Sequence, residues 1–125
     1  MLDKEKEIIN KVVEQLSIMY KVDAEEITKI GSRKHNIVEA RRMFNYYLFT
    51  EKNIRHINMY KFINGMDHAT SIYHIRKIKD LFSIDKELQI KYIELLYLCD
   101  TDNFYTLHKN KIFSDTISEV FKIIK

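Results

Sequence analysis

The sequence contains no proline and only two glycines, Gly31 and Gly65, among its 125 residues. Strands are connected by tight turns, and tight turns depend on glycine and proline. Isoleucine, leucine, lysine and glutamate recur instead at the three- and four-residue spacing that is typical of helices. The sequence therefore predicts an all-α fold, a bundle of about six to seven helices joined by short polar loops.

The length suits a single domain over residues 1–125. With 46% hydrophobic and 31% charged residues, such a chain can bury a core without disulfides or a metal. We expect a helix-turn-helix core over residues 1–82 and a helical carboxy-terminal extension over 83–125. The helices are expected at about 4–20, 23–29, 36–51, 55–63, 68–82 and 86–99 and from 114 onward, with 100–110 mostly loop.

Cys99 is the only cysteine and lies in an apolar run, which is typical of a buried thiol. The amino terminus is charged and does not resemble a signal peptide. No apolar run approaches the ~20 residues that span a bilayer. We therefore expect a cytoplasmic protein that does not bind membranes.

Positive charge is concentrated in the middle of the chain. Residues 29–79 hold eleven Lys/Arg and three Asp/Glu, a net charge of +8, whereas the remaining residues have a net charge of −5. A basic region between acidic ends is typical of a polyanion-binding surface. The alternative is a solvated surface whose charges are unevenly distributed.

Residues 55–82 have the pattern of a helix-turn-helix, in which a short helix and an Asn64-Gly65 turn precede a second helix. On a helical wheel that starts at Asp67, one side is predicted to face the core, namely Ala69, Ile72, Ile75 and Phe82. The opposite side has no carboxylate and is predicted to face outward, with Thr70, Tyr73, His74 and Lys77. Such groups can contact base edges or phosphates. An ordinary solvated helix face is the alternative.

The stretch from Asn64 to Tyr73, N-G-M-D-H-A-T-S-I-Y, resembles the motif G-G-R-D-H-T-T-V-x-H. This motif belongs to the carboxy-terminal DNA-binding domain, domain IV, of the bacterial chromosomal replication initiator DnaA, a Trp-repressor-like helix-turn-helix. Ser32-Arg33-Lys34 resembles the family's basic loop, residues 37–43 resemble the helix after it, and Ile75-Arg76-Lys77-Ile78 resembles its C-R-K-I. The resemblance covers roughly residues 12–81.

The resemblance implies that Asp67, His68 and Thr70 contact bases in the major groove. It also places Arg33 within one position of an arginine that enters the minor groove. The chain departs from the motif at Asn64, Met66, Ala69 and Tyr73, so the base sequence that it prefers is expected to differ. No phosphate-binding G-x-x-x-x-G-K-[ST] loop is present, so the ATPase module of the initiator is missing and no nucleotide is expected.

We therefore expect sequence-preferring binding of double-stranded DNA, in replication initiation or its regulation or in transcription control. The candidate DNA contacts are Arg33, Lys34, Arg41, Arg42, Arg55, Lys61, Asp67, His68, Thr70, Ser71, Tyr73, His74 and Lys77. Further candidate partners are a second copy of the chain and a replication protein. The alternative function is a protein–protein interaction module with an initiator-like fold that regulates a replication initiator. No pattern indicates an enzyme, a cofactor or a metal site, because the five histidines are dispersed.

Overall fold

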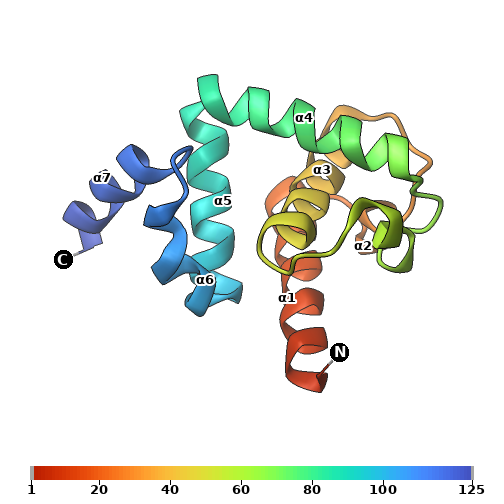
Figure 1. The fold of residues 1–125 in the computed structure, drawn as a ribbon, viewed down its shortest axis with the longest axis horizontal. Coiled ribbons are helices and arrows are strands. Elements are labelled where there is room, and N and C mark those ends of the chain that lie inside the picture. Colours follow the sequence, from red (N-terminus) through yellow and green to blue (C-terminus); the bar gives the residue numbers. More distant parts are fainter. Residues whose placement is uncertain (1, 125) are drawn as a thin grey trace. The chain divides into compact units, whose positions relative to one another are not determined.

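The computed structural model describes residues 2–124, and the side chains of residues 2–123. The described chain is mostly helical and has no strand, which confirms the predicted all-α class (Figure 1). Its elements are α1 (Asp3–Tyr20), α2 (Ala24–Ile27), α3 (His35–Thr50), the 3₁₀ helix η1 (His56–Lys61), α4 (His68–Ile84), α5 (Lys86–Cys99), α6 (Thr101–Thr106), the 3₁₀ helix η2 (Leu107–Lys109) and α7 (Ser114–Ile124).

The chain forms two compact units that meet in sequence within α4, between Ile78 and Lys79. Unit 1 contains α1, α2, α3, η1 and most of α4. Unit 2 contains the end of α4 together with α5, α6, η2 and α7. The predicted border between core and extension, after residue 82, falls in the same helix.

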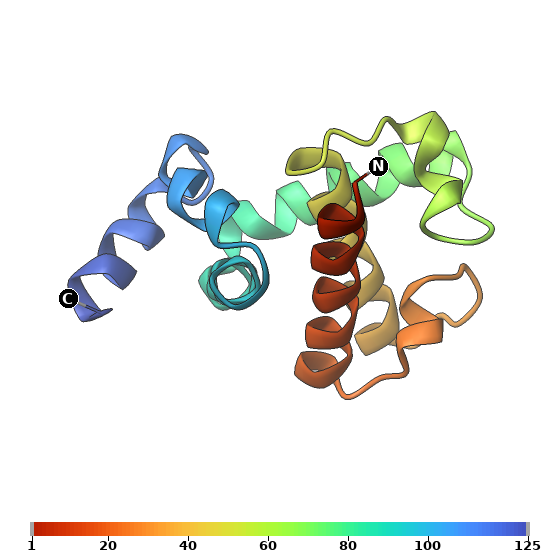
Figure 2. The same cartoon turned by 90° about the horizontal axis from the view of Figure 1, so that it is seen from below.

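Helix α3 is the centre of unit 1, because it contacts α1, α2 and η1. Figure 2 shows α1 and α3 side by side. A stripe of α1 is buried at three- and four-residue spacing, from Ile9 through Val12 to Leu16. Burial on α3 is not confined to one stripe, since the six consecutive residues from Met43 to Leu48 are all buried. A fully buried side chain of this size contributes about 1.5–3 kcal/mol to folding stability. Helix α3 is therefore a stable support for the segments that pack around it.

A left-handed turn connects η1 to α4. Gly65 has a φ of 85°, a conformation that residues with a Cβ rarely adopt, so the predicted turn at Asn64-Gly65 is confirmed. A Cβ at Gly65 would also lie 3.4 Å from the Cβ of Ile30. The two segments are joined through their backbones, since the amide of Ile30 donates to the carbonyl of Asn64 at 2.8 Å and the amide of Asn64 donates to the carbonyl of Thr28 at 2.7 Å.

Gly65→Ala is expected to lower the free energy of unfolding by about 1–2 kcal/mol, because the left-handed backbone disfavours a Cβ. Gly31→Ala is the matched control, since no atom lies within 4 Å of a Cβ built there. Chemical denaturation of the two variants provides the comparison. Equal stability of both variants would contradict a tight, conformationally restricted turn at Gly65.

Unit 2 has its own core around an aromatic cluster of Phe82, Tyr92 and Phe113, whose ring centroids are 4.9–5.6 Å apart. Asp85 caps α5 by accepting from the amide of Leu88 at 3.1 Å. The predicted loop over 100–110 is wrong, because α6 and η2 occupy most of it. Asp100 begins α6, and the buried Phe104 and Leu107 supply the apolar contacts that stabilise this helical segment.

Candidate nucleic-acid interface

The first turn of α4 is capped by Asp67, whose Oδ1 accepts from the amide of Thr70 at 2.7 Å. This hydrogen bond lowers the pKa of the Asp67 carboxyl, and the neighbouring His68 adds to the effect. The carboxylate is therefore held in its ionised form by the helix. Since one oxygen is used by the cap, only the remaining acceptor capacity of Asp67 is available to a base.

Asp67→Ala is expected to lower the melting temperature at neutral pH, whereas Asp67→Asn retains an acceptor and should melt close to the wild type. A carboxyl with a lowered pKa stabilises the fold above its ordinary pKa of about 3.9, and this stabilisation is lost as the pH falls through the folded-state pKa. The difference in melting temperature between the wild type and Asp67→Ala should therefore become smaller in acid. A difference in melting temperature that stays constant down to pH 3 would contradict the role of Asp67 as a helix cap.

The face of α4 that lies toward the core contains Ser71, His74, Ile75 and Ile78, all of them buried. The exposed face contains His68, Ala69, Tyr73, Arg76 and Lys77, and Thr70 is half-buried at its edge. The predicted wheel is thus wrong at His74 and at Ala69, which exchange sides. Arg76 was not among the predicted contacts, although its position three residues after Tyr73 and beside Lys77 could have indicated it.

His74 cannot provide a charged contact at neutral pH. It is 7% exposed, and burial lowers its pKa to about 4, with further contributions from the neighbouring Arg42 and Arg41. The guanidinium of Arg42 is half-buried and lies over the ring of Tyr73, 5.6 Å from its centroid. Arg42 therefore supports the exposed tyrosine. The prediction that His74 contacts DNA is wrong, because its ring is buried.

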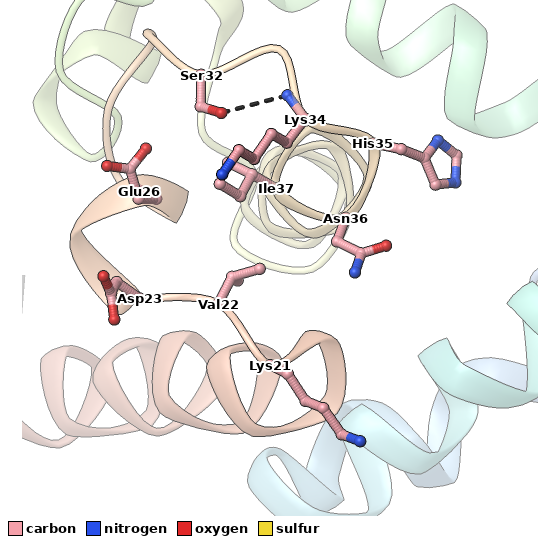
Figure 3. Close-up of a pocket in the computed structure, with 9 residues that line it drawn as sticks. All are labelled: Lys21, Val22, Asp23, Glu26, Ser32, Lys34, His35, Asn36 and Ile37. Carbon is pink, nitrogen blue, oxygen red and sulfur yellow. Dashed lines mark hydrogen bonds between the residues drawn. The ribbon is translucent and has the colours of Figure 1, made fainter.

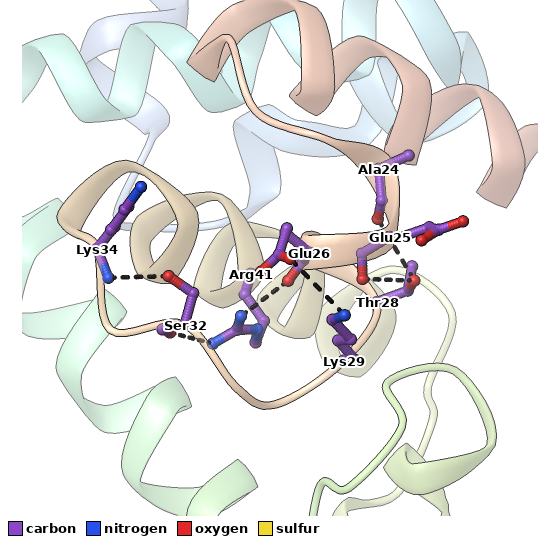
Figure 4. A network of polar contacts seen from close by, with 8 residues as sticks. All are labelled: Ala24, Glu25, Glu26, Thr28, Lys29, Ser32, Lys34 and Arg41. Atoms are coloured by element: carbon purple, nitrogen blue, oxygen red, sulfur yellow. Dashed lines mark hydrogen bonds and ion pairs between the residues drawn. The ribbon is translucent and has the colours of Figure 1, made fainter.

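Arg41 lies between the basic loop, residues 28–34, and α2, and donates hydrogen bonds to both (Figure 4). Arg41 is only 3% exposed, and its guanidinium donates to the carbonyl of Glu26 at 2.8 Å and to that of Ser32 at 3.3 Å. Burial lowers the pKa of Arg41, although the nearby carboxylate of Glu26 acts in the opposite direction and raises it. The prediction that Arg41 contacts DNA is thus replaced by a positioning role, because its guanidinium donates to the backbone of α2 and of the loop. Arg33 and Lys34, by contrast, are exposed.

The basic loop is hydrogen-bonded to the turn that precedes α4. The paired backbones of Lys29 and Asn64 join the basic loop to the turn that precedes Asp67. The pairing thus brings together two segments that are distant in sequence, namely the start of the loop that carries Arg33 and Lys34 and the turn that leads into α4. Arg55 and Lys61, at either end of η1, are exposed as well.

A hollow of about 690 Å³ lies beside the loop, between the end of α1, α2 and the start of α3 (Figure 3). Lys21 and Lys34 line it together with Asp23 and Glu26. The two carboxylates oppose the binding of a phosphate, because like charges repel. We therefore do not include this hollow in the candidate interface.

A buried polar relay connects three elements behind the interface. Asn45 donates to the hydroxyl of Ser71 at 3.2 Å, and the same hydroxyl lies 2.8 Å from Nδ1 of His56. Ser71 is completely buried, so the prediction that it contacts DNA is wrong. His56 was not predicted, because a histidine at the start of a short helix has no distinctive pattern in the sequence.

The described residues contain neither a candidate metal site nor a membrane-spanning helix. No group of three or more histidine, cysteine, aspartate and glutamate side chains is placed to hold a metal ion. None of the helices in residues 2–124 combines the length and the apolar character that crossing a membrane requires.

Comparisons of this chain with protein families, with curated proteins and with solved structures found no match.

Proposed function

We propose that this protein binds double-stranded DNA with sequence preference, through a helix-turn-helix in which α4 enters the major groove. The observation that carries the proposal is the backbone bridge between Lys29 and Asn64. It joins the start of the basic loop to the turn that leads into a helix whose exposed face, from His68 to Lys77, has no free carboxylate. An arginine-bearing loop next to a recognition helix can contact the minor and major grooves of one duplex.

Within this proposal the exposed residues have separate roles. Thr70 and Tyr73, which are accessible on the outward face of α4, are proposed to contact base edges, and Arg76 and Lys77 lie further along the same face. Arg33 is proposed to enter the minor groove, with Lys34, Arg55 and Lys61 on phosphates. The resemblance to the initiator domain supports a role in replication initiation or its regulation, and transcription control fits the same geometry. The proposal places the protein in the cytoplasm and includes no catalytic step, nucleotide or metal.

The test is a titration of a labelled duplex against the protein at increasing salt. If about five phosphates are contacted, the log–log slope of the association constant against salt should be about −4 to −5. Lys34→Ala and Lys61→Ala should each reduce the slope by about 1. A flat salt response at measurable affinity, or no binding to duplex at low salt, would overturn the proposal.

One observation favours the second candidate, an interaction module that regulates a replication initiator. Unit 2 exposes large apolar side chains, including Ile84 at 84% and Leu98 at 51%. Such groups are commoner at protein interfaces than on a surface that contacts nucleic acid. A complex with an initiator protein that forms equally well at high salt and without DNA would support this candidate.

A further inference from the structure

The start of α4 packs on α3 through polar side chains. Among residues 68–74, the two buried side chains are those of Ser71 and His74. Asn45 of α3 donates to the hydroxyl of Ser71 at 3.2 Å. Arg42, three residues earlier on α3, lies near enough to His74 for its charge to add to the effect of burial in lowering the pKa of that ring. Residues three apart share one face of a helix, and we call these four residues the polar cluster.

The polar cluster is not fully hydrogen-bonded. Asn45 is completely buried, and its Oδ1 has no hydrogen-bond partner among the described residues. The same holds for the buried Nε of Arg42 and Nδ1 of His74. A buried polar atom without a partner destabilises a fold, because it gives up its water and gains no hydrogen bond. Stability alone therefore does not explain why a polar residue occupies position 45.

Apolar packing constrains the rotation of this end of α4 only weakly. The buried apolar side chains of α4 in unit 1 are those of Ile75 and Ile78, which follow the polar cluster in the sequence. Apolar contacts have no preferred direction, whereas a hydrogen bond restricts both a distance and an angle. The bond between Asn45 and Ser71 therefore defines how the first turns of α4 are rotated about the helix axis.

The hydroxyl of Ser71 also joins α4 to η1. It lies 2.8 Å from Nδ1 of His56. The ring of His56 in turn stacks on Phe49 of α3 and on His68 of α4, with centroids 4.4 Å and 5.9 Å away. One buried hydroxyl thus links α3 to both helices of the proposed helix-turn-helix.

A rotation of α4 would displace the side chains that are proposed to read bases. Thr70 and Tyr73 directly precede Ser71 and His74, and successive residues of a helix are about 100° apart around its axis. The direction of the two outward side chains therefore follows from that of the two buried ones. Direct readout depends on how well such side chains match the donors and acceptors of base edges.

We propose that Asn45 is a positioning residue that determines specificity: through Ser71 it fixes the rotation of α4, so that Thr70 and Tyr73 are presented to base edges. The proposal rests on the proposed function, because it concerns the helix that is assigned there to the major groove. Buried polar groups can define one arrangement of helices while they contribute little to stability. Loss of Asn45 should therefore reduce discrimination between base sequences and leave the fold intact.

Leucine has the same branched outline as asparagine but no polar atom, so Asn45→Leu is the test. The variant loses the bond to Ser71 together with the unpaired Oδ1, and the Ser71 hydroxyl keeps His56 as its partner. Its melting temperature should equal or exceed that of the wild type. Its preference for a duplex that the wild type selects from a random pool, over a scrambled duplex, should fall about five- to tenfold. The salt slope should stay unchanged, because the phosphate contacts remain.

Asn45→Asp is the conservative variant. A carboxylate oxygen accepts from the hydroxyl of Ser71, so a hydrogen bond between α3 and α4 is retained. The buried charge should lower the melting temperature, while most of the preference for the selected duplex should remain. The two variants should thus respond in opposite ways. In a general structural role, by contrast, the preference would fall together with stability.

Val12→Ala is the control for stability itself. Val12 is completely buried in α1, so its variant should melt at a lower temperature and still discriminate like the wild type. If Asn45→Leu keeps the wild-type preference, or loses affinity for the selected and the scrambled duplex equally, the inference is wrong. A preference that falls as far in Val12→Ala as in Asn45→Leu would also overturn it. These two variants decide the question even if Asn45→Asp fails to fold.

The two proposals fail in different ways. A wild-type protein that does not bind duplex contradicts the proposed function. A wild-type protein that selects a duplex with the expected salt slope, together with an Asn45→Leu variant that selects it equally well, contradicts only the role of Asn45.

Discussion

Replacing Arg41 with methionine is expected to lower the free energy of unfolding by about 2–3 kcal/mol. The guanidinium donates to the backbone carbonyls of Glu26 and Ser32 from a position that is only 3% exposed. Methionine fills much of the same volume but has no donor, so both carbonyls lose their partner. Urea denaturation measures the loss. Arg33→Met is the matched control, since Arg33 is exposed in the same loop.

The same variant should bind duplex more weakly, although Arg41 has no donor directed at DNA. Without these hydrogen bonds Arg33 and Lys34 would be free to move. Ordering them again on the DNA would cost free energy, so the affinity for duplex would decrease. Arg41→Lys should rescue little of either effect, because a single ammonium lacks the planar fork that reaches two carbonyls. An Arg41→Met variant as stable as Arg33→Met, with wild-type affinity, would contradict the positioning role.

Tyr73→Ala is expected to reduce the preference for the specific duplex over a scrambled one by about 1–3 kcal/mol, and to leave the melting temperature unchanged. Tyr73 is 56% exposed in the middle of the outward face of α4, and Arg42 lies over its ring. Its loss would remove the proposed contact to bases, while the buried face of α4 would remain intact.

Tyr60→Ala is the matched control, because Tyr60 is 57% exposed but lies on η1. A side chain that contacts only the DNA backbone contributes to affinity without changing the preference for a base sequence. Equal discrimination by the Tyr73 and Tyr60 variants would mean that this face of α4 does not read bases.

The sequence was sufficient for elements that have a regular apolar stripe and a clear stop. The predicted helix at 4–20 corresponds to α1, and the one at 86–99 has the same bounds as α5. The turn at Gly65 was also predictable, because few residue types tolerate its left-handed backbone conformation. In each case the information is local, so neighbouring residues were enough.

The errors concern polar residues that are buried by distant partners. His74 and Ser71 look like surface residues in a helical pattern, but they face the core beside Arg42 and Asn45 of α3. In the sequence, Arg41 resembles a phosphate contact. In the structure, its guanidinium is bonded to the carbonyls of Glu26 and Ser32. The stack of Phe49, His56 and His68 joins three segments and has no signature in any one of them.

The central claim is that α4 and the basic loop together read a duplex, and selection from a random pool of duplex DNA tests it most directly. The wild-type protein should enrich one motif with an A·T-rich flank, because Arg33 is proposed to enter a narrow minor groove. Tyr73→Ala should weaken the enrichment of the core motif, and Arg33→Ala should weaken that of the flank. A pool that remains random after repeated rounds with the wild-type protein would contradict the claim.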